Sequence, residues 1–130
     1  MSAENRDKTS KKKILLAEDD DSMRRFLEIT LQRANFEVIS TEDGLEAMKA
    51  SLENEIDAVV ADAMMPNLSG YDLCRIFRQN PDKKDIPFII LSGFNSNEIP
   101  DSDACRADAY LTKKNNLKEE LTKTLNELIN

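Results

Sequence analysis

Five short apolar runs recur along the chain, and longer segments with helical periodicity separate them. The runs cover residues 13–17, 36–40, 56–61, 87–91 and 109–112. Short continuous apolar runs are typical of strands that are buried on both faces of a parallel sheet. Because parallel neighbours must be joined by crossover connections, usually helices, this alternation predicts a single α/β domain with helices on both faces of the sheet.

The segments between the runs show the three- and four-residue spacing of amphipathic helices. The first helix is predicted from Ser22, with Asp20 or Asp21 as its N-cap. Others are predicted over 44–52, with Leu45, Met48 and Leu52 on one side, over 71–78, and from Leu117 through Leu121, Leu125 and Leu128. A short, poorly specified helix is expected in the polar stretch around Pro100. Residues 1–12 nearly lack apolar side chains and are expected to form a polar tail to a domain over 13–130.

Composition narrows the chemistry that such a domain can perform. The absence of histidine excludes imidazole general bases, Ser-His-Asp catalysis and the usual zinc sites. Cys74 and Cys105 lack metal-ligand spacing, so we expect reduced, packed thiols. A net charge of -7 argues against a broad nucleic-acid interface. No apolar stretch is long enough to span a bilayer and the N-terminus is not signal-like, which predicts a cytoplasmic protein without a membrane partner.

The residues just past the predicted strands carry the candidate chemistry. Glu18 and Asp19 follow the first strand, Asp62 the third, Ser92 the fourth and Lys113 the fifth. The carboxyl ends of parallel strands meet at one edge, where ligands of open α/β sheets bind. Three carboxylates in one pocket require a cation, and oxygen-only ligands favour Mg²⁺. A lysine and a hydroxyl beside that ion suit the remaining oxygens of a phosphoryl group.

Across roughly Lys13 to Ile129 the chain resembles the response-regulator receiver domains of two-component signalling systems. The resemblance rests on ILLAEDD followed by SMRR, on VVADAMMPNLSGYDL, on FIILSG and on YLTKK. It implies a flavodoxin-like, doubly wound sheet of five parallel strands in the order 2-1-3-4-5. It also implies a phosphoprotein that takes part in a phosphorelay and switches a protein-binding surface.

The resemblance assigns roles in metal binding and phosphorylation residue by residue. Asp62 would become an aspartyl phosphate in a Mg²⁺-dependent reaction, with Asp19 as a direct metal ligand. Glu18 would bind the metal largely through water, and the backbone carbonyl of Met64 would be the third protein ligand. The side chain of Met64 cannot hydrogen-bond an attacking water, which predicts slow self-dephosphorylation.

Further roles follow for the phosphoryl contacts and the switch. Ser92 and Lys113 would contact the phosphoryl group, and Ser92 with Tyr110 matches the family's switch pair. A histidine kinase or a histidine phosphotransfer protein would be the donor and a downstream protein the target, so the domain itself would not be an enzyme. No output segment follows Ile129, so the chain is expected to act by binding another protein or by passing its phosphate on.

The chain also departs from the family pattern. Lys114 stands where receiver domains usually place a proline after a cis peptide that aims the lysine. A non-proline cis bond costs about 2.5–4 kcal/mol, and a trans peptide would be expected to aim Lys113 differently. Arg106-Ala107 replaces the expected small pair before the last strand, and Pro100 weakens the helix ahead of it. The output surface is therefore expected to be atypical.

The same residues are compatible with simpler roles and with three different functions. Taken one at a time, each residue could have a purely structural role. The acids could cap a helix and Ser92 could stabilise a turn, while Lys113 could be a surface charge and Tyr110 an aromatic side chain of the core. The chain could be an adaptor that docks without phosphorylation. It could be a Mg²⁺-dependent phosphatase with an aspartate nucleophile, although such enzymes normally have an acid where Met64 stands. A flavin-binding domain would want a phosphate-cradling loop after the first strand, where this chain has four acids.

Overall fold

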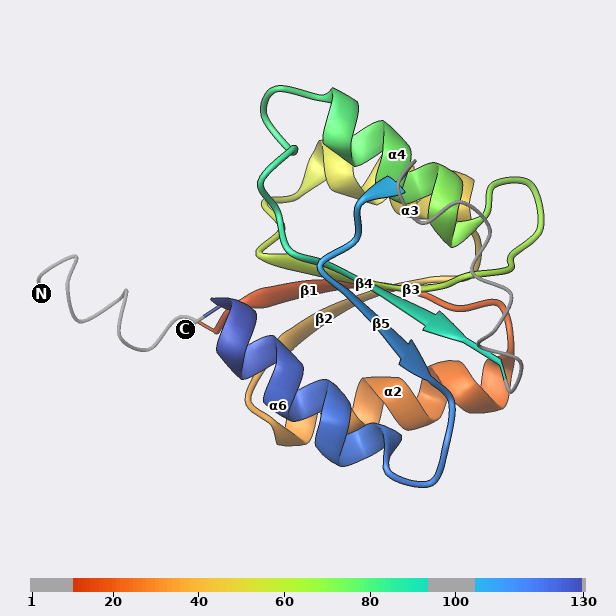
Figure 1. Cartoon of the computed structure of the whole chain (residues 1–130), viewed down its shortest axis with the longest axis vertical. Coiled ribbons are helices and arrows are strands. Elements are labelled where there is room, and N and C mark those ends of the chain that lie inside the picture. The colour runs from red at the N-terminus through yellow and green to blue at the C-terminus, as the bar shows by residue number, and fades with distance from the viewer. Residues whose placement is uncertain (1–10, 94–104, 130) are drawn as a thin grey trace, which may run out of the picture.

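Five parallel strands form one sheet in the order β2-β1-β3-β4-β5 in the computed structural model, which describes residues 11–93 and 105–129 (Figure 1). The strands are β1 (Lys13–Ala17), β2 (Glu37–Thr41), β3 (Ala58–Asp62), β4 (Phe88–Ser92) and β5 (Ala109–Thr112). The helices are α2 (Asp21–Arg33), α3 (Gly44–Glu53), α4 (Gly70–Gln79) and α6 (Leu117–Ile129). The predicted α/β class and the strand order are confirmed.

Helices cover both faces of the sheet and enclose two apolar layers. α3 and α4 lie on one face, and α2 and α6 lie on the other (Figure 1). Along β1, Leu15 packs into the layer under α3 and α4, whereas Ile14 and Leu16 pack into the layer under α2 and α6. Successive side chains of a strand point to opposite faces, so a strand covered on both sides must be apolar throughout. This is why β1, β3 and β4 read as nearly continuous apolar runs, whereas the edge strands β2 and β5 are only partly buried.

Side-chain caps fix where three helices begin. Asp20 accepts a hydrogen bond from Met23 N, Asp43 from Glu46 N, and Ser69 from Asp72 N. These caps satisfy backbone donors that have no partner within the helix. The sequence placed the first N-cap at Asp20 or Asp21, and the structure selects Asp20. The caps at Asp20 and Ser69 thereby fix where α2 begins after Glu18 and where α4 begins after Asp62.

The structure corrects the side predicted for the helix over 44–52, because, of Leu45, Met48 and Leu52, only Met48 packs against the core. Leu45 is 53% exposed and Leu52 is 72% exposed, whereas α3 buries Gly44, Ala47 and Ser51. A Cβ atom on Gly44 would lie only 2.3 Å from the carbonyl oxygen of Leu68. This close contact leaves no room for a side chain at the start of the helix. The side of α3 that carries small residues therefore packs against the rest of the domain, and the two leucines point outward.

The remaining predicted elements differ by small shifts or fall outside the described residues. β2, β3 and β4 are shifted by one or two residues from the predicted runs, while β1 and β5 match them. The expected helix near Pro100 and most of the predicted tail, residues 1–10, lie outside the described residues. Among the described helices, none combines the length and apolar character needed to cross a membrane.

Candidate functional site

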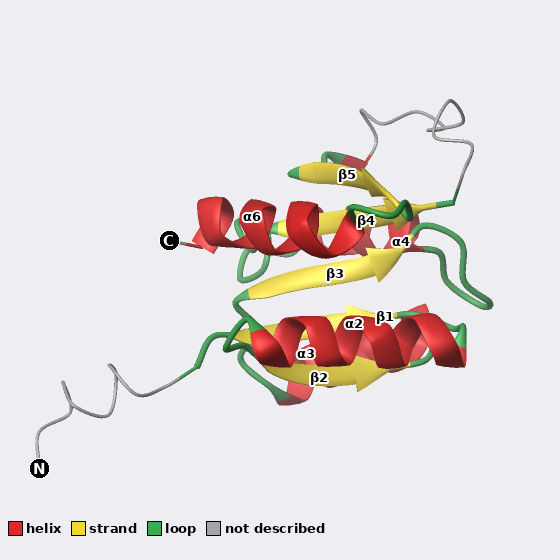
Figure 2. Ribbon diagram, turned by 90° about the horizontal axis from the view of Figure 1, so that it is seen from below, coloured by secondary structure: helices red, strands yellow, loops and turns green. Residues whose placement is uncertain are grey.

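The carboxyl ends of all the strands lie along one edge of the sheet, so the residues that follow them come together (Figure 2). Asp62 is the last residue of β3 and pairs in register with Leu91 of β4. Ser92 ends β4 and pairs with Thr112, the residue before Lys113. The backbone N–H of Lys113 donates to the carbonyl oxygen of Ser92 at 2.9 Å. The sheet register therefore places the end of β5 beside the ends of β4 and β3.

Lys113 links two acids that come from different strands. Its Nζ lies 2.9 Å from Oε1 of Glu18 and 3.2 Å from Oδ1 of Asp62. The described residues contain no cis peptide, so the Lys113–Lys114 bond is trans. Lys114 N donates to the carbonyl oxygen of Thr112 at 2.8 Å, a bond that a proline could not make. Lys113 thus reaches the acids without the proline that is usual in receiver domains.

Glu18, Asp19 and Asp62 form an acidic cluster in which one carboxylate oxygen from each residue lies within 4.8 Å of the other two. Glu18 is fully buried and Asp62 is 8% exposed, whereas Asp19 is exposed. Oε2 of Glu18 accepts a hydrogen bond from Asp20 N at 3.1 Å. Oε1 is buried and, within the described part of the chain, has only its ion pair with Lys113 and no aligned hydrogen bond. A buried carboxylate oxygen with unused acceptor capacity fits a hard cation such as Mg²⁺.

Glu18 and Lys113 act in opposite directions on the pKa of Asp62. Burial and the neighbouring Glu18 carboxylate raise the pKa of Asp62 from 3.8 to about 6, although Lys113 and the Met64 N–H act in the opposite direction. Burial lowers the pKa of Lys113, but its contacts with Glu18 and Asp62 outweigh this effect, and the net pKa is raised. Asp62 is therefore a carboxylate whose ionised form depends on nearby positive charge.

After β3 the chain runs through a loop over 63–69 and returns to Asp62 at Gly70, where α4 begins. Gly70 N donates to the carbonyl oxygen of Ala63 at 3.0 Å. A Cβ atom on Gly70 would lie 2.3 Å from the carbonyl oxygen of Asp62, so only glycine fits here. Met64 N lies 3.5 Å from Oδ1 of Asp62, and the Met64 side chain is 72% exposed. The end of β3 is thus backed by the start of α4, and the Met64 side chain beside it is exposed.

The remaining predicted site residue, Tyr110, lies on β5 opposite Ile90. Its hydroxyl contacts Sγ of Cys105 at 3.1 Å and accepts from Ala107 N at 3.4 Å. Cys74 Sγ donates to the carbonyl oxygen of Cys105 at 2.9 Å. Both cysteines are buried, which agrees with the prediction of packed thiols. Burial and the thiol of Cys105 raise the pKa of Tyr110 to about 12, so its hydroxyl stays protonated.

Sequence reasoning missed two residues that hold the acidic cluster. Thr41 accepts a hydrogen bond from Glu18 N through its carbonyl oxygen at 3.1 Å, and its hydroxyl donates to the carbonyl oxygen of Leu16. Arg24 donates to the carbonyl oxygen of Glu18 at 3.0 Å. The spacing of Asp21 and Arg24 suggests a surface ion pair within one helix, but no sequence signal indicates the contact with Glu18.

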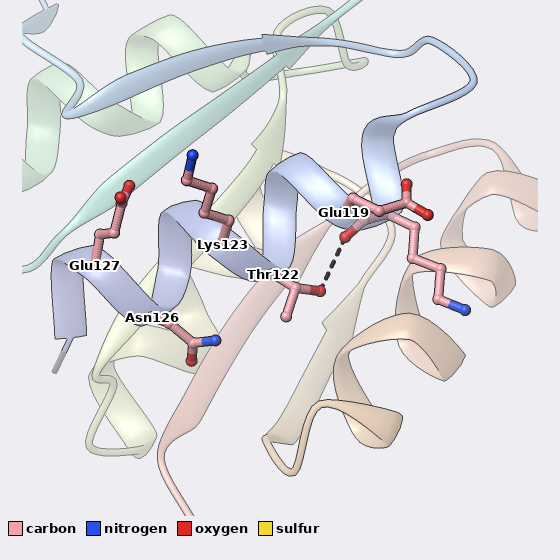
Figure 3. A pocket seen from close by; sticks show the side chains of 6 residues that line it. Glu119, Thr122, Lys123, Asn126 and Glu127 are labelled. Atoms are coloured by element: carbon pink, nitrogen blue, oxygen red, sulfur yellow. Dashed lines mark hydrogen bonds between the residues drawn. The ribbon is translucent and has the colours of Figure 1, made fainter.

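A separate hollow of about 650 Å³ lies along the outer face of α6 (Figure 3). Its lining comes from one helix: Lys118, Glu119, Thr122, Lys123, Asn126 and Glu127. The Thr122 hydroxyl bonds the carbonyl oxygen of Lys118 within that helix at 2.9 Å. The lining contains none of the strand-end residues, so this hollow is not part of the candidate site.

The fold and its acidic edge match a known family. The family model for the response regulator receiver domain matches residues 14–126. The chain belongs to this family. The matched range includes every candidate residue of the acidic edge and all the strands except the first residue of β1, Lys13, which confirms the resemblance inferred from the motifs.

Sequence relatives of this receiver domain differ in length. The response regulator receiver protein CpdR of Brucella abortus is 35% identical over 109 residues, which cover 83% of this chain and 89% of CpdR. The response regulator ArlR of Staphylococcus saprophyticus is 32% identical over 113 residues, which cover 85% of this chain. The chain spans about half the length of ArlR, 50%.

Solved structures of receiver domains share the fold. The chemotaxis response regulator CheY4 of Vibrio cholerae has a TM-score of 0.82 at 28% identity, covering 92% of this chain and 99% of CheY4. The response regulator TrrA of Thermotoga maritima, solved with Mg²⁺ and BeF, has a TM-score of 0.81 at 32% identity, covering 90% of this chain and 98% of TrrA. This receiver domain therefore has the architecture of the two-component signalling family.

Proposed function

We propose that Asp62 is the phosphoacceptor of this receiver domain. The observation that carries the proposal is the position of Lys113 Nζ, which contacts both Asp62 and Glu18 at the carboxyl edge of the sheet. A buried acid beside a lysine and a second acid provides two things that an in-line phosphoryl transfer needs: a nucleophile and positive charge held next to it.

The proposed cofactor is Mg²⁺, and the residues present fit it. The carboxylates of Glu18, Asp19 and Asp62, with the carbonyl oxygen of Met64, would hold the ion, which TrrA contains together with BeF. When bound, Mg²⁺ offsets the negative charge on carboxylate and phosphoryl oxygens. The unused acceptor capacity of the buried Glu18 Oε1 and the crowding of three acids both support this assignment.

In the proposed reaction an ionised oxygen of Asp62 attacks the phosphorus of a phosphohistidine donor. The new O–P bond forms as the N–P bond breaks, and the imidazole of the donor leaves with the electron pair of that bond. Lys113 favours the ionised form of Asp62 and is placed to hold a phosphoryl oxygen afterwards. Ser92 at the end of β4 would donate its hydroxyl to another phosphoryl oxygen.

The proposed output is a shift at Ser92 and Tyr110. Once Ser92 turns toward the phosphoryl group, Tyr110 would move inward and change the surface formed by β5 and the helices beside it. A histidine kinase or a histidine phosphotransfer protein would supply the phosphoryl group, and a downstream protein would read the surface. The proposal includes a cytoplasmic location and no catalysis by the domain beyond its own phosphorylation.

The test is the intact mass of the protein after incubation with acetyl phosphate and Mg²⁺. We expect the gain of one phosphoryl group, lost in Asp62→Asn and in the presence of a chelator. Asp57→Asn is the matched control, because Asp57 lies just before β3 at the opposite end of the same strand and accepts from Lys13 N. No gain in the wild-type protein would favour the adaptor that docks without phosphorylation.

A further inference from the structure

Arg24 is a half-enclosed cation beside the backbone of the acidic pair. It lies near the start of α2, and its side chain is only 17% exposed. Arg24 does not stand at the end of a strand, and it has no part in the proposed phosphoryl transfer. Its position next to Glu18 therefore needs another explanation. The acids that pair with Arg24, Asp21 and Glu42, are not among the proposed metal ligands.

The guanidinium of Arg24 connects three parts of the chain. Nη1 donates to the carbonyl oxygen of Glu18 at 3.0 Å, and Nη2 donates to Oδ1 of Asp21 at 2.6 Å. Nη2 also lies 3.9 Å from Oε1 of Glu42, the residue that follows β2. A planar fork of fixed N–H donors can meet such separate acceptors at once, which the single ammonium of a lysine cannot do in the same geometry.

The contact of Arg24 with the Glu18 carbonyl oxygen affects both Glu18 and Asp19. The peptide unit from Glu18 to Asp19 is planar, so holding its oxygen also fixes the direction in which the chain enters Asp19. Glu18 is further held by its N–H on Thr41 and by Asp20 N on Oε2. Asp19 is exposed, so its orientation depends on this backbone more than on packing.

The neighbouring Arg25 carries the same charge as Arg24 but makes no contact with the Glu18 carbonyl. Its side chain is 74% exposed and pairs with Glu28 of the same helix at 3.6 Å. Both arginines bring one positive charge to the start of α2, but the contacts of Arg24 reach the acidic edge and the ion pair of Arg25 stays on the helix surface. The chain thus offers a control of equal charge one residue away.

We infer that Arg24 is a positioning residue that orients the Glu18–Asp19 pair for a divalent cation. The inference rests on the proposed function, because it concerns the metal ligands of the same site. Arg24 touches neither the metal nor the phosphoryl group; it acts through the backbone of Glu18.

The first test compares Mg²⁺ affinities by NMR titration of Arg24→Met, Arg24→Lys and Arg25→Met. We expect Arg24→Met to bind Mg²⁺ about tenfold more weakly, as is usual when a residue that orients metal ligands is removed. Arg24→Lys should lose part of this affinity, and Arg25→Met should stay within about twofold of the wild type because an exposed charge is screened. If Arg24 supplied charge alone, Arg24→Met would bind Mg²⁺ as tightly as Arg25→Met or more tightly, and that result would overturn the inference.

The second test needs no metal and separates the inference from the proposed function. Amide hydrogen exchange at Asp20, whose N–H bonds Glu18 Oε2, should become severalfold faster in Arg24→Met, while Val60 in the buried strand β3 should not change. Unchanged exchange at Asp20, or a wild-type protein that binds no Mg²⁺, would overturn the role of Arg24. A wild-type protein that binds Mg²⁺ but takes no phosphoryl group would refute only the proposed phosphoacceptor.

Discussion

Replacing Asp62 by asparagine should stabilise the metal-free protein at neutral pH. Asp62 is 8% exposed, and its ionised form is opposed by burial and by Glu18, which together raise its pKa to about 6. Asparagine keeps the size of the side chain and removes the charge. The site therefore carries a charge that the fold alone would disfavour, which is common where function rather than stability sets the residue.

The magnitude follows from the difference between the ordinary pKa of 3.8 and the value of about 6 in the folded protein. At about 1.36 kcal/mol per pH unit, the ionised form of Asp62 costs at most about 3 kcal/mol of folding free energy. Asp62 is not completely buried and water screens part of its charge, so we expect a gain of about 1–2 kcal/mol for Asp62→Asn. The loss of the contact with Lys113 is small, because Lys113 keeps its ion pair with Glu18.

The pH dependence has a definite sign. Below about pH 4 Asp62 is protonated in the folded and unfolded chains alike, and the two proteins should differ little. Between pH 4 and 6 the folded wild type retains a proton that the unfolded chain has lost. The unfolding free energy of the wild type therefore falls relative to that of Asp62→Asn as pH rises from about 4 through about 6. Above pH 6 the difference between the two proteins should stay at its full value.

The assay is urea unfolding of both proteins with a chelator present, at pH values from 4 to 8. Equal stabilities at pH 7.5, or a gain that does not change between pH 4 and 7, would refute the electrostatic reasoning. Addition of Mg²⁺ at pH 7.5 should then raise the unfolding free energy of the wild type more than that of the variant, because the ionised acid favours the cation.

Three further predictions concern single residues around Asp62. Gly70→Ala should lower the unfolding free energy by about 1–3 kcal/mol in urea unfolding, because its Cβ would strike the Asp62 carbonyl oxygen, whereas Gly93→Ala, with open space around it, should change little. Met64→Asn should speed loss of the phosphoryl group about tenfold, followed by intact mass over time, because an amide can orient an attacking water; an unchanged lifetime would contradict this. Lys113→Met should move the NMR titration midpoint of Asp62 above 6, because Lys113 lowers that pKa; a midpoint at or below 6 would count against the ion pair.

The apolar runs and the residues after them determined most of the fold from sequence. β1 and β5 have their predicted bounds, and the other strands differ by one or two residues. A strand that is buried on both faces must be apolar throughout, so the first polar residue after an apolar run marks the end of the strand. The acids, the serine and the lysine stand where the apolar runs end. Because parallel strands end at the same edge of the sheet, the sequence predicts that these residues lie along that edge.

Only the tertiary structure decided how these groups meet. The inner side of α3 follows from the contact of Gly44 with Leu68, which no helical periodicity reveals, so Leu45 and Leu52 lie outside. The reach of Lys113 to two acids depends on the register of β5 against β4, and it holds with a trans peptide. Arg24 contacts Glu18 only because the turn after β1 brings the first turns of α2 over that carbonyl. Periodicity reports which face of an element is apolar, whereas such contacts between side chains and distant backbone depend on distances that sequence spacing does not encode.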